Sequence, residues 1–120
     1  MQSFLIFFYL LDMCYNLIPE DDLGGMLGAI SPMLWEDGRP MDSSVYNDWK
    51  KTLTRVEFNR SNIVKTACSF LEEYERKYGF NFSQTKCTLL SAVDEDILEK
   101  AFLYAGQMNT KYQYQDYLID

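Results

Sequence analysis

Apolar residues dominate the first 17 positions, and their pattern predicts a helix over Gln2 to Leu17. After Ser3 the only polar breaks are Asp12 and Asn16, which lie four residues apart and therefore on one face of a helix. A helix that is apolar nearly all round is typical of the centre of a domain, and we expect the Asp12–Asn16 face to reach solvent at the rim. Short apolar runs discriminate poorly between helix and strand, so the run from position 4 to 10 is also compatible with a strand.

A short amphipathic helix is predicted to follow from Pro19. Proline is favoured in the first turn of a helix, and the acids at positions 20–22 suit the positive end of the helix dipole. The next apolar residues recur with helical spacing, at Leu23, Met26, Leu27 and Ile30. Three glycines in this segment each lower its intrinsic helix stability by about 1 kcal/mol. They indicate either close approach to a neighbouring element or a loop that is only partly helical.

Residues 31–42 are predicted to be a connection, because Asp37-Gly38 and Arg39-Pro40 are turn dipeptides. Trp35 in this connection either folds back onto the core, as large aromatic residues usually do, or is offered to a partner. Asp42 or Ser43 then caps a third helix that runs to about Arg55. The apolar stripe of that helix comprises Val45, Trp49, Leu53 and Val56, with Tyr46 beside it.

The strongest pattern in the chain predicts a fourth helix, capped by Asn59 or Ser61 and ended by Gly79. Its predicted buried face comprises Ile63, Ala67, Phe70, Leu71, Tyr74 and Tyr78. Arg76 and Lys77 occupy the last turn, where the helix dipole favours basic residues.

Residues 83–93 have no decisive period, which leaves room for minor β structure between residues 80 and 93. Acidic residues at 94–96 then begin a fifth helix, whose predicted buried face is Ile97, Leu98, Ala101, Phe102, Ala105 and Met108. Residues 111–120 either extend this helix or pack as an arm. We therefore expect one domain over residues 1–120, an all-α compact bundle of four or five helices with the first and fourth at its centre.

The composition is that of an ordinary globular domain, with 48% hydrophobic and 24% charged residues in a chain of 120. The chain carries 11 basic and 18 acidic residues, a net charge of −7. That charge keeps a protein in solution, repels nucleic acid and anionic membranes, and attracts basic partners. We expect no nucleic acid and no membrane among its partners.

The apolar N-terminal run is interpreted as a buried helix, with a membrane segment as the alternative. A signal peptide would need a basic start and a small-residue cleavage site, and a membrane span would need about 20 apolar residues. The three cysteines are Cys14, Cys68 and Cys87; they form no CxxC pair and stand among apolar residues. They therefore indicate three reduced, buried thiols and a cytoplasmic protein.

The sequence holds no histidine, which removes the commonest general base and the commonest zinc ligand. Dinucleotide-binding, P-loop and serine-hydrolase motifs are absent as well. Helix starts account for the acidic runs at 20–22 and 94–96, and their spacing is not that of a calcium loop. We expect no catalytic residue, no metal site and no cofactor, although magnesium held between carboxylates of different helices would leave no trace in one sequence.

One basic stretch comprises Lys50, Lys51, Arg55, Arg60 and Lys65. It is short, has no interleaved exposed aromatic residues and belongs to an acidic chain, unlike a nucleic-acid-binding footprint. We interpret it as a solvated face.

Residues 19–49 read PEDDLGGMLGAISPMLWEDGRPMDSSVYNDW. The run DDLGGMLG at 21–28, the turn DGRP at 37–40 and Asp48-Trp49 form a recurring pattern. This pattern, over about a quarter of the chain, resembles small uncharacterised bacterial proteins found among polymorphic-toxin immunity genes. The resemblance implies a cytoplasmic binding protein that neutralises a toxin, and it carries over no catalytic residue.

The leading hypothesis is therefore a non-catalytic protein-binding module, an immunity-type inhibitor of a basic toxin. The first 42 residues hold seven acids and one base, Arg39, and Trp35 could supply the apolar anchor of an interface. The candidate partner-binding residues are Glu20, Asp21, Asp22, Trp35, Glu36, Asp37 and Asp42. The alternatives are a structural or regulatory subunit, whose tyrosine-rich tail pairs with itself, and a carboxylate-based metal-dependent hydrolase.

Overall fold

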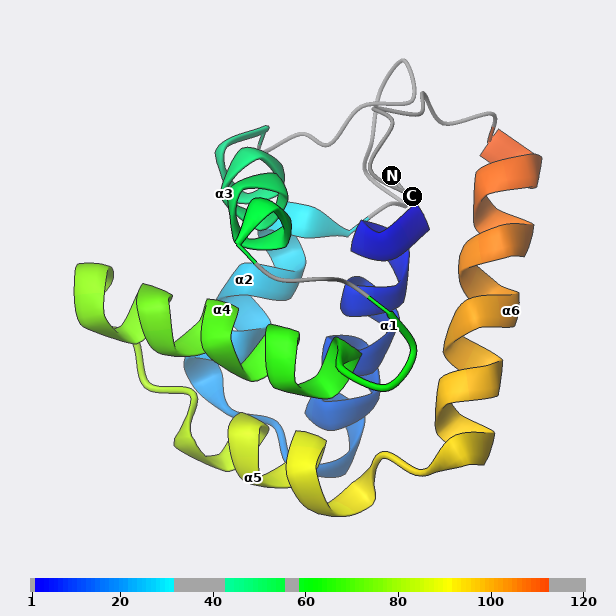
Figure 1. The fold of residues 1–120 in the computed structure, drawn as a ribbon. Helices are drawn as coiled ribbons and strands as arrows, with labels where there is room; N and C mark the ends of the chain where they lie inside the picture. The colour runs from blue at the N-terminus through cyan, green and yellow to red at the C-terminus, as the bar shows by residue number, and fades with distance from the viewer. Residues whose placement is uncertain (1, 32–42, 56–58, 113–120) are drawn as a thin grey trace.

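The structure, a computed structural model, describes residues 2–31, 43–55 and 59–112. Six α-helices make up most of this part of the chain (Figure 1). They are α1 (Gln2–Leu17), α2 (Asp21–Ile30), α3 (Ser43–Thr54), α4 (Ile63–Tyr78), α5 (Ser83–Ala92) and α6 (Glu95–Tyr112). The predicted all-α class is confirmed for this part of the chain. The radius of gyration is 13.2 Å, close to the value of about 14 Å expected for a compact domain of this length.

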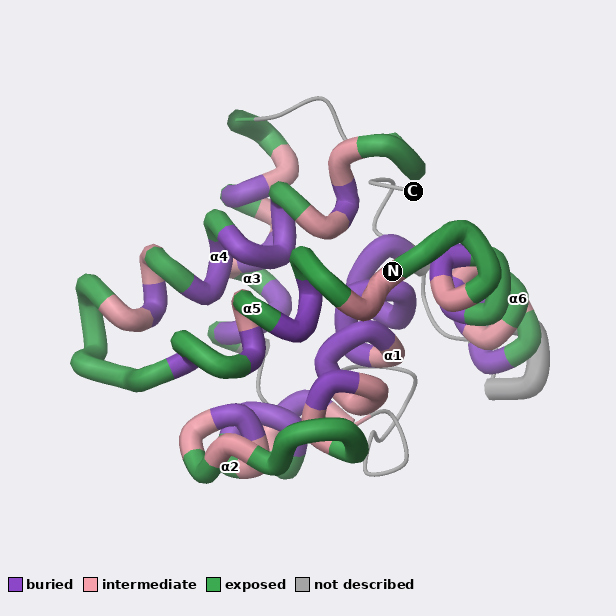
Figure 2. Tube along the Cα trace, turned by 90° about the horizontal axis from the view of Figure 1, so that it is seen from below, coloured by how far each residue is buried: buried purple, intermediate pink, exposed green. Residues whose placement is uncertain are grey.

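Helix α1 is the centre of the molecule, as its apolar sequence predicts. It packs against α2, α5 and α6, and its residues 3–8 are all buried. The tube in Figure 2 shows α1 buried along most of its length between the surrounding helices. The strand alternative for residues 4–10 is wrong, since this whole segment is helical.

The polar face of α1 lies at the rim, which confirms the expectation from its spacing. Asn16 is exposed and Asp12 is half-buried. Partial burial raises the pKa of the Asp12 carboxyl above its ordinary value, because removal from water disfavours the charged form.

An aromatic cluster packs α3 and α4 against α1. Trp49 stacks on Phe7 with ring centroids 4.3 Å apart, and its indole N–H donates to Ser3 Oγ at 3.2 Å. Phe70 meets the ring of Phe7 edge-on at 5.1 Å and that of Trp49 at 5.8 Å. All three rings are almost completely buried, so the predicted stripes of the third and fourth helices are confirmed at these positions.

The ends of α4 follow the sequence with two corrections. Gly79 adopts φ +76° and donates its N–H to the Glu75 carbonyl, which confirms the predicted glycine terminus, since this backbone conformation favours glycine. The N-cap residue is Asn62, while Asn59 Oδ1 accepts the backbone N–H groups of Ser61 and Asn62 in the preceding turn. Tyr78 is 58% exposed, so its assignment to the buried face is wrong.

Residues 83–92 form helix α5, and the described chain contains no strand at 80–93. The prediction of minor β structure is therefore wrong, and the described chain has six helices where four or five were predicted. The physical reason is that carboxylates from elsewhere in the fold accept the free N–H groups at the start of α5, which local periodicity does not report.

Helix α6 begins where the acidic run predicts. Asp94 Oδ1 accepts the Ile97 N–H at 2.9 Å, the geometry of a helix N-cap. Four of the predicted residues are buried and two, Ile97 and Phe102, are half-buried. The helix reaches Tyr112, so it takes in the start of the predicted tail; residues 113–120 lie outside the described chain. None of the helices in the described ranges is both long and apolar enough to cross a bilayer.

Candidate binding groove

The structure describes three of the seven predicted partner-binding residues, all at the start of α2. Trp35, Glu36, Asp37 and Asp42 lie outside the described residues, and their role stays a prediction. The other three residues differ in what their side chains contact; they are Glu20, Asp21 and Asp22.

Glu20 is turned toward α5. Its Oε1 accepts the Thr85 N–H at 3.0 Å and the Thr85 hydroxyl at 2.8 Å, and its Oε2 accepts the Gln84 N–H at 3.1 Å. A carboxylate on the first turn of a helix satisfies unpaired N–H groups and complements the helix dipole. Glu20 therefore has a structural role that its sequence neighbours do not indicate.

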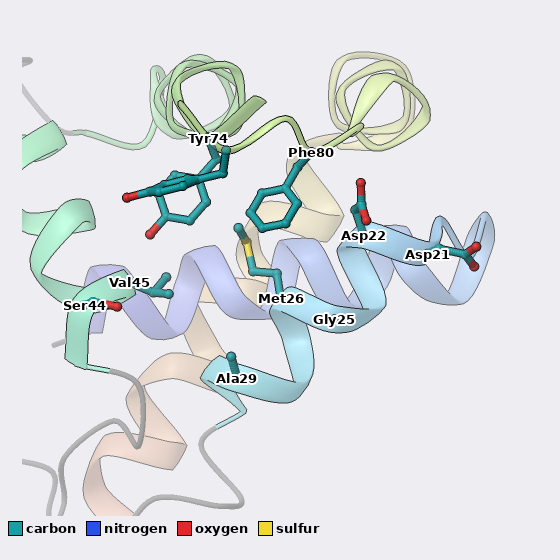
Figure 3. Close-up of a pocket in the computed structure, with 10 residues that line it drawn as sticks. Asp21, Asp22, Gly25, Met26, Ala29, Ser44, Val45, Tyr74 and Phe80 are labelled. Atoms are coloured by element: carbon teal, nitrogen blue, oxygen red, sulfur yellow. The ribbon is translucent and has the colours of Figure 1, made fainter. Parts of the chain in front are cut away.

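Asp22 and Asp21 border a groove. Asp22 Oδ2 accepts the Asn81 N–H at 2.7 Å, which ties the α4–α5 loop to α2. Asp21 is exposed. Both carboxylates lie at one end of the groove, Asp22 next to Phe80 and Asp21 farther out along α2 (Figure 3).

The groove, which we call the α2–α4 groove, has a volume of about 490 Å³ and lies between α2, the start of α3 and the end of α4. It is lined by Asp21, Asp22, Gly25, Met26, Ala29, Ser44, Val45, Tyr74, Tyr78 and Phe80. A volume of this size is typical of sites that hold a small molecule or a large side chain. Figure 3 shows the rings of Tyr74 and Phe80 and the Met26 side chain along its wall.

Three aromatic residues at the end of α4 form one wall. The ring centroids of Tyr74 and Phe80 are 6.2 Å apart with planes 24° from parallel. Tyr78 lies 5.0 Å from Tyr74 and 6.1 Å from Phe80. Tyr78 and Phe80 are 58% and 39% exposed, whereas Tyr74 is buried and donates its hydroxyl to Asp48 Oδ2 at 2.7 Å.

The charge of the groove is negative. Among its described lining residues two are acidic and none is lysine or arginine. The nearest basic residue in sequence to the aromatic wall, Lys77, pairs instead with Glu73 at 2.9 Å. The groove therefore combines carboxylates with exposed aromatic faces, the two kinds of group that attract organic cations.

A second hollow of about 400 Å³ borders α2 and is lined in part by Asp12, Tyr15, Asp21 and Gly28. At this face Gly24 lies against Tyr15: a Cβ at position 24 would stand 2.9 Å from Tyr15 Cε1. The expected close approach is thus confirmed for Gly24. At Gly25 and Gly28 a Cβ would meet no described atom within 4 Å.

The remaining candidate chemistry is distributed over the surface. Arg55 pairs with Glu73 and Arg60 with Glu95, and most of the basic stretch is exposed.

Within residues 2–31, 43–55 and 59–112, no three of His, Cys, Asp and Glu gather where they could hold a metal ion. The three cysteines are free; Cys14 and Cys68 are buried, but Cys87 is exposed, so the expectation of three buried thiols is wrong for Cys87.

No protein-family model matches the sequence, and neither a curated protein nor a solved structure is significantly similar to it. The resemblance to immunity proteins rests on residues 19–49. The structure describes two parts of this segment, 19–31 and 43–49, which form α2 and the first half of α3. Both parts contribute to the wall of the α2–α4 groove.

Sequence reasoning missed the aromatic wall. Tyr78 and Phe80 stand on either side of Gly79, at the point where the chain leaves the helix. Aromatic residues that flank a helix-ending glycine cannot both continue the buried face of that helix. This position is the signal from which their exposure could have been predicted.

Proposed function

We propose that the protein is a non-catalytic binding module, an immunity-type inhibitor that neutralises a basic toxin in the cytoplasm. The observation that carries the proposal is the α2–α4 groove, in which Asp22 adjoins an aromatic wall, Asp21 lies farther out along α2 and none of the described lining residues is basic. Tyrosine and other aromatic residues are enriched at the energetic centres of protein interfaces. Complementary charge accelerates association with a basic partner.

Three further features support the proposal. The chain has a net charge of −7, which extends the attraction to a basic partner beyond the groove. The segment that resembles immunity proteins supplies Asp21 and Asp22 to the groove. Three free cysteines suit the reducing conditions of the cytoplasm.

Co-expression with a toxin encoded beside this gene tests the proposal. We expect the chain to restore growth of cells that express the toxin, and the two purified proteins to form a complex whose association slows as salt rises. Charge reversal at Glu36 and Asp37 should slow association, and Trp35→Ala should speed dissociation. A neighbourhood without a toxin gene, or a neighbouring toxin that neither binds nor is neutralised, would contradict the proposal.

A matched pair of glycine variants places the interface. Gly25 lines the α2–α4 groove and Gly28 lines the second hollow, and at both positions a Cβ meets open space among the described atoms. Gly25→Leu should fill the groove and abolish neutralisation, while Gly28→Leu should retain it. Both replace a helical glycine, so both should raise helix stability by about 1 kcal/mol and differ only in the surface that they fill.

A further inference from the structure

The aromatic wall and the carboxylate of the α2–α4 groove together define a site for one cationic side chain. Phe80 and Tyr78 present exposed ring surface, and Tyr74 and Phe80 lie 6.2 Å apart with nearly parallel planes. Figure 3 shows Asp22 beside the ring of Phe80. A cation that lies over an aromatic face and also reaches a carboxylate gains from both groups.

Asp22 is held in place and keeps an oxygen for a ligand. The Asn81 N–H occupies Oδ2 at 2.7 Å, and no described group bonds Oδ1. The same hydrogen bond fixes the residue next to Phe80, so the carboxylate and the ring are positioned by one contact. A site that is ordered before binding costs less entropy to fill.

We infer that the α2–α4 groove, where Asp22 adjoins the ring of Phe80 and Phe80 adjoins that of Tyr74, recognises an arginine side chain on the surface of the partner protein. Arginine suits these walls better than lysine, because its planar guanidinium stacks on aromatic rings, bonds carboxylates through a fork of N–H groups and is weakly hydrated. Met26 and Val45 of the groove would pack against the methylene stem. This inference deepens the proposed function and rests on it for the source of the arginine.

The test titrates the full chain with N-acetyl-arginine N-methylamide at constant ionic strength, followed by NMR of the aromatic rings. The matched probes are the lysine analogue and the citrulline analogue, which keeps the shape of arginine without its charge. We expect the arginine analogue to shift the ring signals of Tyr74, Tyr78 and Phe80 in a saturable manner. The lysine analogue should bind about three-fold or more weakly, and the citrulline analogue should give no saturable shift.

Two variants test the assigned groups. Asp22→Asn removes the charge but retains an oxygen for the Asn81 N–H, and it should weaken binding of the arginine analogue about five-fold. Its control is Asp96→Asn at the start of α6, which changes the net charge equally at an exposed acid outside the groove and should leave binding unchanged. Phe80→Leu should weaken binding about three-fold, and Gly25→Leu should abolish it while Gly28→Leu does not.

The outcomes separate this inference from the proposed function. Equal binding of the arginine and citrulline analogues, equal losses in Asp22→Asn and Asp96→Asn, or tighter binding of lysine would overturn the arginine site. A toxin that is neutralised normally by the Gly25→Leu variant would overturn it too and leave the inhibitor function standing. Saturable arginine binding in the groove, without any neutralised toxin, would support the site and contradict the proposed function.

Discussion

Glu20 and Thr85, which are 65 positions apart in the chain, are joined by two hydrogen bonds to a single carboxylate oxygen. Glu20 Oε1 accepts the Thr85 N–H at 3.0 Å and its hydroxyl at 2.8 Å. The contact holds the start of α5 next to the residue that precedes α2. It also shows why an acid in an acidic run need not face a partner.

Loss of this cap should destabilise the fold. Glu20→Ala leaves the N–H groups of Gln84 and Thr85 without their acceptor and should cost about 1.5 kcal/mol of unfolding free energy. Urea denaturation followed by circular dichroism measures the change. Glu99→Ala, at an exposed position of α6, is the control and should stay within about 0.5 kcal/mol of wild type. Equal stabilities of the two variants would show that the cap contributes nothing.

The aromatic face of α4 should divide into a core part and a surface part. Phe70 and Leu71 are 1% and 0% exposed, so truncation of either to alanine should cost about 2–5 kcal/mol. Tyr78→Ala, in the last turn of the same helix, should cost under about 1 kcal/mol because its ring is mostly in solvent. Chemical denaturation of the three variants measures their free energies of unfolding. A loss of unfolding free energy in Tyr78→Ala as large as that in Phe70→Ala would place the Tyr78 ring in the core.

Cysteine reactivity should be unequal. Cys87 is exposed, whereas Cys14 and Cys68 are buried, and burial next to Cys68 raises the pKa of the Cys14 thiol to about 12. Since the thiolate is the reactive form, Ellman's reagent at pH 8 should label one thiol rapidly and two only after unfolding. Cys87→Ser should abolish the rapid phase. A rapid phase that survives in this variant would contradict the burial of the other two.

The stability of the α4–α5 corner should depend on pH through Glu75. Burial raises the pKa of this carboxyl, but hydrogen bonds from Lys86 and from the Phe82 N–H, with the charge of Lys86, outweigh burial and hold the pKa below its usual 4.5. A carboxyl whose pKa is lower in the folded state contributes stability that is present above pH 4.5 and is lost as the pH falls through the folded pKa.

Glu75→Gln should therefore destabilise by about 1.5 kcal/mol at pH 7, with a difference from wild type that shrinks as the pH falls below 4.5. Denaturation midpoints across pH 3 to 7 measure it. Lys86→Gln removes the same ion pair and should lose the part of the pH dependence that Lys86 supplies, while the Phe82 N–H hydrogen bond to Glu75 keeps the remainder. A Glu75→Gln penalty that is constant over this range would refute the assigned cause.

The sequence by itself determined the helices that carry their own signals. The nearly unbroken apolar run of α1, the periodic face of α4 and the acidic starts of α2 and α6 each report local burial or local dipole energies. Gly79 ends α4 because a residue at φ +76° is best served by glycine, which is again a local requirement. These features could be predicted because the interactions that decide them lie within one or two turns of the chain.

Only the tertiary structure decided the identity of α5 and the assembly of the groove. The α5 segment lacks a decisive apolar period, and its helical start is supported by Glu20, which accepts the N–H of Gln84 from 64 residues away, and by Glu75, which accepts the N–H of the N-cap residue Phe82. The α2–α4 groove brings Asp22 to Phe80 across more than fifty positions. Contacts between residues so far apart depend on how the helices pack, and neither hydrophobic periodicity nor helix-capping preference encodes that arrangement locally.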